Sequence, residues 1–206
     1  MSSFKGFYYK GRKSVPHRRI KDTILILCEG KETEPNYFKS FKKDLDKFGI
    51  KIDIEIEGIG YNTDLLVKKA IKLKQKREDI IEVWCVFDRD NFKEKHFKDA
   101  FVLARENKIE IAYSIECFEI WFLLHFDYIK SAISRKDYNK KLSKLLHKKY
   151  KKNAKDMYNL LKNKQEIAIK NAKKLENNYS NMMKIYDRNP STTVYKLVER
   201  LNEYKK

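Results

Sequence analysis

The alternation of strand-like apolar runs with helical patterns is the feature that most constrains the fold of this chain. The strand-like runs lie at residues 24–28, 49–58, 80–87 and 109–114. Apolar residues recur at helical spacing in the segments between them, residues 33–48, 62–76 and 93–107. Strands that alternate with helices of about ten to fifteen residues predict an α/β fold with a parallel sheet of about four strands flanked by helices.

The strand patterns also differ from one another. Residues 24–28 and 80–87 are almost continuously apolar, which is typical of strands buried on both faces, whereas residues 49–58 alternate Ile with charge, as an edge strand does. The crossovers are expected to be right-handed, and in the strand order 2-1-3-4 the first and third strands would be neighbours. After Ser114 the strand patterns stop, and residues 118–126 are apolar nearly all round, as in a helix buried on both sides.

These patterns divide the chain into three parts. We expect a basic N-terminal arm at residues 1–21, an α/β core at residues 22–127, and a Lys-rich helical extension at residues 128–206 that packs on the sheet. With no long linker between them, the core and the extension are expected to fold together.

The positive charge is concentrated in two segments. The 206-residue chain has a formal net charge of +18. Seven Lys or Arg and no acid lie in residues 1–21, and eleven Lys or Arg against one acid lie in residues 130–155. This distribution favours a polyanionic partner such as nucleic acid. The alternative is that the lysines only fill solvated faces.

Other features of the composition concern location. No apolar run approaches the roughly 18 residues of a membrane span, so we expect no contact with a membrane. Residues 1–19 lack the apolar segment of a secretory signal. Three cysteines, an odd number without zinc-like spacing, fit a reducing compartment, and we therefore expect a cytoplasmic protein.

Acidic residues follow two of the buried strands. Glu29 comes directly after the first strand, and Asp88 and Asp90 come after the third. In a parallel sheet with these strands adjacent, the three carboxylates meet at the carboxyl edge, where ligands of such sheets bind. Their mutual repulsion is relieved by a hard divalent cation, so the pattern predicts a site for Mg²⁺ or Mn²⁺. The alternative for the two aspartates is a helix cap, which needs only one of them.

Four motifs together resemble those of the RloB-like family. They are "CEGKETEPNYF", "VFDRDNF", "CFEIWFLLHF" and "NPSTTVYKLVERL", in the family's order over residues 22–203. One departure is the pair Ile115-Glu116, where the family tends to have Asn-Pro before Cys-Phe-Glu.

The resemblance implies a Toprim-like core and a role in prokaryotic anti-phage defence or abortive infection. Toprim domains use a glutamate after the first strand and an Asp-x-Asp after the third to hold Mg²⁺ for phosphodiester chemistry. Those positions are Glu29, Asp88 and Asp90 in this chain, the residues that the charge argument also selects. The family commonly occurs beside an ATPase, so the resemblance also implies an ATPase partner.

Several polar residues allow two interpretations each. Glu119 interrupts an apolar segment, and it either forms an ion pair with a Lys or Arg of the extension or joins the acidic site as a catalytic residue. His125 is more simply a packed histidine than a ligand. Ser191 after Pro190 is expected to cap the last helix, the alternative being a phosphate site. Glu116 is a further acid near the same edge.

The function favoured by these observations is a metal-dependent nuclease. Glu29 is expected to act as general acid or base, with Asp88 and Asp90 on the cation. The expected phosphate-binding residues are basic: Arg18, Arg19, Arg89, Lys140, Lys141, Lys144, Lys148 and Lys149. Two alternatives stay open, namely a non-catalytic nucleic-acid-binding or regulatory subunit, and a receiver- or phosphatase-like α/β domain in which Ser114 follows the fourth strand.

Overall fold

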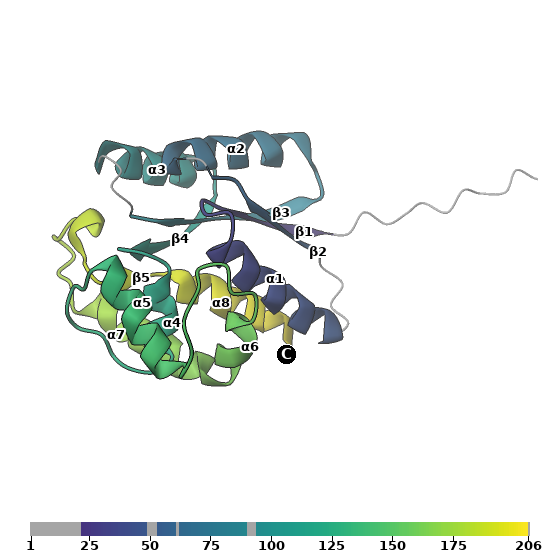
Figure 1. Ribbon diagram of the computed structural model, residues 1–206. Coiled ribbons are helices and arrows are strands. Elements are labelled where there is room, and N and C mark those ends of the chain that lie inside the picture. The colour runs from purple at the N-terminus through teal and green to yellow at the C-terminus, as the bar shows by residue number, and fades with distance from the viewer. Residues whose placement is uncertain (1–21, 49–52, 61, 90–93, 206) are drawn as a thin grey trace, which may run out of the picture.

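The strand-like runs form one five-stranded sheet in the order β2-β1-β3-β4-β5. The computed structural model describes residues 22–48, 53–60, 62–89 and 94–205 (Figure 1). The strands are β1 (Thr23–Cys28), β2 (Asp53–Gly58), β3 (Ile80–Asp88), β4 (Glu110–Ile115) and β5 (Ser191–Thr192). The pairs β1–β2, β1–β3 and β3–β4 are parallel, which confirms the predicted parallel sheet and the edge position of β2. They also make β1 and β3 neighbours, which is the condition under which the acids were expected to meet.

The fifth strand was not expected from the sequence. It is two residues long and pairs antiparallel with β4, with Ser114 opposite Thr192. The Ser114 and Thr192 hydroxyls are hydrogen-bonded at 3.0 Å, and Thr193 N–H donates to the Tyr113 carbonyl at 2.9 Å. A pair of hydroxyl residues has no apolar periodicity, so its strand character depends on β4. The predicted helix cap at Ser191 was therefore wrong, because the last helix begins later, with Thr193 at its N-cap.

The helices lie in two layers. Those within the α/β part are α1 (Thr33–Leu45), α2 (Thr63–Lys76) and α3 (Glu94–Glu106). Helix α4 (Glu119–Leu124) ends the α/β part, and the helices of the extension are α5 (Arg135–Leu145), α6 (Met157–Leu161), α7 (Gln165–Asn177) and α8 (Val194–Asn202). Helices α2 and α3 cover one face of the sheet, and α1 with the extension covers the other (Figure 1).

Alternate residues of β1 enter separate cores on the two faces of the sheet. Leu25 and Leu27 pack in the core with α2 and α3, whereas Ile24 and Ile26 pack in the larger core with α1 and the extension. This two-sided burial explains why β1 has no polar alternation. The larger core combines these strand residues with side chains of the extension, which confirms that the extension packs on the sheet.

Helix α4 is the centre of the larger core. Ile120 through Leu124 are all fully buried, as the apolar pattern of this segment predicted. The helix contacts α5 and α7 of the extension and also β4 and β5. None of the helices in the described part of the chain combines the length and hydrophobicity that a membrane span requires.

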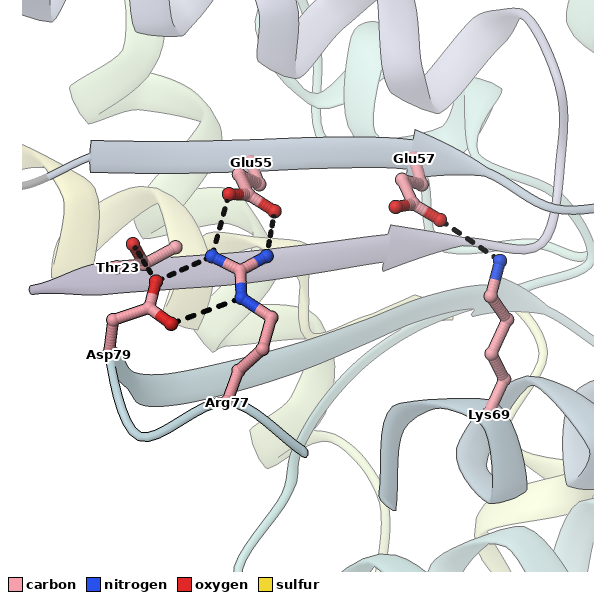
Figure 2. Close-up of polar contacts among 6 residues, drawn as sticks. All are labelled: Thr23, Glu55, Glu57, Lys69, Arg77 and Asp79. Carbon is pink, nitrogen blue, oxygen red and sulfur yellow. Dashed lines mark hydrogen bonds and ion pairs between the residues drawn. The ribbon is translucent and has the colours of Figure 1, made fainter. Parts of the chain in front are cut away.

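An ion network joins the strands at the amino end of the sheet, away from the acidic residues of the carboxyl edge. Arg77 donates to both oxygens of Glu55 on β2 and to Asp79, which precedes β3 (Figure 2). Asp79 also accepts a hydrogen bond of 3.0 Å from the Thr23 hydroxyl at the start of β1. The network therefore links three neighbouring strands through side chains.

This network predicts a loss of stability in acid. The hydrogen bond from Arg77 lowers the pKa of the Asp79 carboxyl to about 2. The unfolded chain therefore binds a proton at higher pH than the folded one, so stability is present above the ordinary Asp pKa of about 4 and is lost as pH falls towards 2. We expect urea denaturation between pH 5 and pH 2.5, approximately, to show a shallower loss for Asp79→Asn than for the wild type. Parallel curves would contradict this role for Asp79; Asp127→Asn, at an exposed acid, is the control.

Candidate functional site

The carboxyl edge of the sheet brings Glu29 and Asp88 together. Cys28 and Val86 are opposite each other in the β1–β3 register, so Glu29, directly after β1, lies beside the last residues of β3, which ends at Asp88. The backbone N–H of Asp88 donates to the Glu29 carboxylate at 3.3 Å, and the N–H of Glu29 donates to the Val86 carbonyl at 2.9 Å. The predicted meeting of these two acids is thus present, whereas Asp90 lies outside the described residues.

Both acids line a pocket of about 560 Å³ at this edge. Three further acids, Glu32, Glu34 and Glu119, line the same pocket. Of the five acids, Glu29, Glu34 and Glu119 are less than 10% exposed, whereas Glu32 is exposed. Basic residues also line it: Lys31, Arg135 and Lys152. The pocket therefore combines buried negative charge with neighbouring cations.

Glu34 is the site residue that sequence reasoning missed. It lies in the first turn of α1, where an acid is ordinarily solvated and favoured by the helix dipole. A signal was present, because Glu34 precedes Phe38, Phe41 and Leu45 at helical spacing and so shares their buried face. Gly30 allows its approach, since a Cβ at Gly30 would overlap the Glu34 carboxylate.

Glu119 has a partner that the sequence did not suggest. It begins α4, is 2% exposed, and accepts a hydrogen bond of 3.0 Å from the Tyr150 hydroxyl. Tyr150 itself is buried, and burial followed by the Glu119 charge raises the pKa of its hydroxyl. Glu119 is thus held by a hydroxyl of the extension and lies in the acidic pocket.

Burial and then neighbouring charge raise the pKa values of three of the acids, Glu29, Glu34 and Asp88. Burial raises the pKa of Glu29 to about 8. Burial and then the charges of Glu34, Glu119 and Glu29 raise the pKa of Asp88 well above its usual range. Burial and the charge of Glu119 also raise the pKa of Glu34. The cluster carries more negative charge than its neighbours compensate.

The chemistry of these groups fits a hard divalent cation. The donors are carboxylate oxygens, which Mg²⁺ and Mn²⁺ prefer. The Asp88 Oδ1 atom is buried and has no hydrogen-bond partner in the described part of the chain. Among the described residues, no three acids, histidines or cysteines are arranged as a preformed metal-binding group. The argument that these residues suit a divalent cation therefore rests on the type of donor atom and on the unpartnered Asp88 oxygen.

The predicted phosphate-binding residues lie in different surroundings. Lys140, Lys141 and Lys144 are on α5, whereas Lys148 and Lys149 follow it, and Lys148 pairs with Asp156 at 2.6 Å. None of these five lines the acidic pocket. Arg18 and Arg19 lie outside the described residues.

Arg89 is engaged by the protein itself. Its guanidinium donates to Glu116 at 2.9 Å and to the Tyr186 carbonyl at 2.8 Å, and it lies over the Tyr186 ring. Glu116 also accepts a hydrogen bond of 3.0 Å from Asn189. These contacts tie the turn after β3 to the segment before β5, and they give Glu116 a structural role.

His125 is a packed histidine, as expected. It is 1% exposed, and its Nδ1 is 2.8 Å from the Trp121 carbonyl. Burial lowers its pKa to about 4, so the imidazole is neutral near pH 7. It does not line the acidic pocket.

The fold and the site together define an α/β protein with an acidic pocket at the carboxyl edge of a largely parallel sheet. The model of the RloB-like protein family matches residues 24–201, and the chain belongs to that family. Comparison with curated proteins and with solved structures found no match.

Proposed function

We propose that this protein is a metal-dependent nuclease that cleaves phosphodiester bonds of nucleic acid. The single observation that carries the proposal is the gathering of Glu29, Glu34, Asp88 and Glu119 in one pocket at the carboxyl edge. The resemblance of "CEGKETEPNYF" and "VFDRDNF" to Toprim motifs adds support, because it selects Glu29 and Asp88 independently of the pocket.

The residues of the pocket would have different roles in the reaction. Asp88, together with Asp90 outside the described residues, would hold Mg²⁺ or Mn²⁺, with Glu29, Glu34 and Glu119 beside Asp88 in the pocket. The bound ion would supply Lewis-acid polarisation of the scissile phosphate. Glu29 would exchange the proton of the attacking or leaving oxygen. Lys31, Arg135 and Lys152 would hold the substrate phosphates at the rim.

The receiver-like alternative finds little support. Its hydroxyl candidate, Ser114, is fully buried, hydrogen-bonded to Thr192, and does not line the pocket. The fifth strand is short and antiparallel rather than part of a parallel sheet. A non-catalytic nucleic-acid-binding or regulatory subunit is the alternative that needs an experiment. The family resemblance extends the proposal to an effector of anti-phage defence in the cytoplasm with an ATPase partner.

A cleavage panel tests the proposal. The substrates are duplex DNA, single-stranded DNA, tRNA and mRNA, each with Mg²⁺ or Mn²⁺, with a chelator, and with the Asp88→Asn variant. We expect metal-dependent cleavage of at least one substrate by the wild type and none by the variant. Binding of nucleic acid without cleavage of any substrate, with or without the ATPase partner, would favour the non-catalytic alternative.

A further inference from the structure

A second hollow, of about 570 Å³, lies along the exposed side of α1. We call it the α1 groove and define it by Asn36, Lys39, Lys43, Lys47, Lys155 and Asn159. Helix α1 also contributes Glu34 to the acidic pocket, and Lys152, three residues before Lys155, lines that pocket. The two hollows thus border the same two segments of the chain.

The wall of the α1 groove opposite the helix is held in place by hydrogen bonds. The Thr33 hydroxyl donates to the Lys152 carbonyl at 3.0 Å, and the Ser40 hydroxyl donates to the Lys155 carbonyl at 3.0 Å. Asn36 donates to the Asn153 carbonyl at 3.3 Å between them. Three polar side chains of one helix therefore fix the segment that carries Lys152 and Lys155.

The groove presents a regular row of cations. Lys39 and Lys43 are on α1, and Lys47 lies in the short 3₁₀ turn Asp46–Phe48 that follows it; all three are exposed. They follow one another at four-residue intervals, which on an α-helix separates the Cα atoms of Lys39 and Lys43 by about 6 Å. Lys155 is exposed on the opposite wall. Within the described residues, ion pairs are seen for Lys47, with Asp44 at 3.5 Å, and for none of the other three.

One acid, Asp44, also borders the groove, and its charge is compensated from the interior side. Lys162 lies 3.1 Å and Lys205 lies 3.5 Å from its carboxylate oxygens. The Tyr158 hydroxyl donates to it at 2.9 Å. The net character of the groove is therefore cationic.

We propose that the α1 groove binds the phosphates of a single nucleic-acid strand that continues out of the acidic pocket. The spacing of the lysine row is comparable with the separation of successive phosphates along a strand. The described lining holds no aromatic side chain, so the contacts go to the backbone and carry no base sequence. The inference deepens the proposed function, since it gives the path by which the substrate leaves the site.

Binding measurements test this path without requiring cleavage. Labelled single-stranded DNA and RNA of about 30 nucleotides are titrated with the full chain carrying Asp88→Asn, with a chelator present, over a range of salt. Lys39→Gln, Lys43→Gln and Lys155→Gln are then added together. We expect the log-log salt dependence to flatten by about 2, because each phosphate contact on a single strand contributes about 0.7. At about 50 mM salt the Kd should rise on the order of 10²-fold.

The matched control removes the same charge from the other side of the sheet. Lys72, Lys76 and Lys108 are exposed lysines on or next to α2 and α3, which cover the opposite face (Figure 1). Their triple replacement by Gln should leave the salt dependence within error of the parent. Equal flattening in both variants, or none in the groove variant, would overturn the proposal. Circular dichroism and melting curves confirm folding, and the single Lys43→Glu change gives a second test.

The outcome separates the groove from the nuclease assignment. If the cleavage panel fails but the groove variant alone flattens the salt dependence, the groove stands as a nucleic-acid surface of a non-catalytic protein. If cleavage is found and the groove variant binds as the control does, the nuclease stands and the strand leaves the pocket by another path.

Discussion

Replacing Asp88 by Asn is expected to abolish cleavage and, in metal-free buffer, to raise the melting temperature. The carboxylate is close to Glu29, Glu34 and Glu119, and one of its oxygens is buried without a hydrogen-bond partner among the described residues. Asn keeps the shape and removes the charge, so repulsion within the pocket falls. A gain of about 1 kcal/mol would raise the melting temperature of a chain of this size by roughly 2–4 °C.

The pH dependence of this gain has a definite sign. The pKa of Asp88 is raised in the folded state, so the folded protein binds a proton that the unfolded chain releases near pH 4. Protonation of Asp88 therefore stabilises the folded wild type fully below about pH 4, and this stabilisation is lost as pH rises. We expect Asp88→Asn to exceed the wild type in stability at pH 7 and to lose the advantage near pH 4.

Calorimetric melting at both pH values, with a chelator, measures this difference. Asp127→Asn removes an exposed acid outside the pocket and should leave both cleavage and melting temperature nearly unchanged. Cleavage by Asp88→Asn at the wild-type rate would contradict the nuclease assignment. A melting temperature below that of the wild type at pH 7 would contradict the account of repulsion among the acids.

The sequence alone was enough to predict the strands of the sheet and part of the site. The strands β1 to β4 were predicted from apolar runs such as Ile24–Cys28, because two-sided burial leaves a continuous hydrophobic signature. Their order, 2-1-3-4, was a condition of the argument and is shown by the structure. The meeting of Glu29 and Asp88 follows from that order, since each comes at the end of one of two adjacent parallel strands. Local pattern and topology were enough for both.

The parts that the sequence did not predict depend on contacts between distant segments. β5 is a strand only because Thr192 pairs with Ser114, which lies 78 residues earlier. The partner of Glu119 is Tyr150, on a segment that the apolar pattern does not place near the sheet edge. Glu34 was predictable from helical spacing, but its position in the first turn favoured a solvated role. Glu34 differs from an ordinary first-turn glutamate in that its side chain is buried.

Replacing Glu29 by Gln is expected to lower turnover on the order of 10²–10⁴-fold while metal affinity falls little. Glu29 is held by the Asp88 N–H at one oxygen, and Gln can accept the same hydrogen bond, so the turn after β1 should keep its position. The variant cannot carry the proton between the attacking or leaving oxygen and water. A loss of turnover with retained metal binding would therefore assign proton transfer to Glu29.

The measurement pairs single-turnover cleavage with calorimetric titration of Mg²⁺ or Mn²⁺. Glu32→Gln is the matched control, because Glu32 lines the same pocket but is exposed at its rim. Its turnover should change far less than that of Glu29→Gln. Complete loss of metal binding in Glu29→Gln would make Glu29 a primary ligand instead, and Glu34, which lines the same pocket and shares its buried charge, would then be the next candidate for proton transfer.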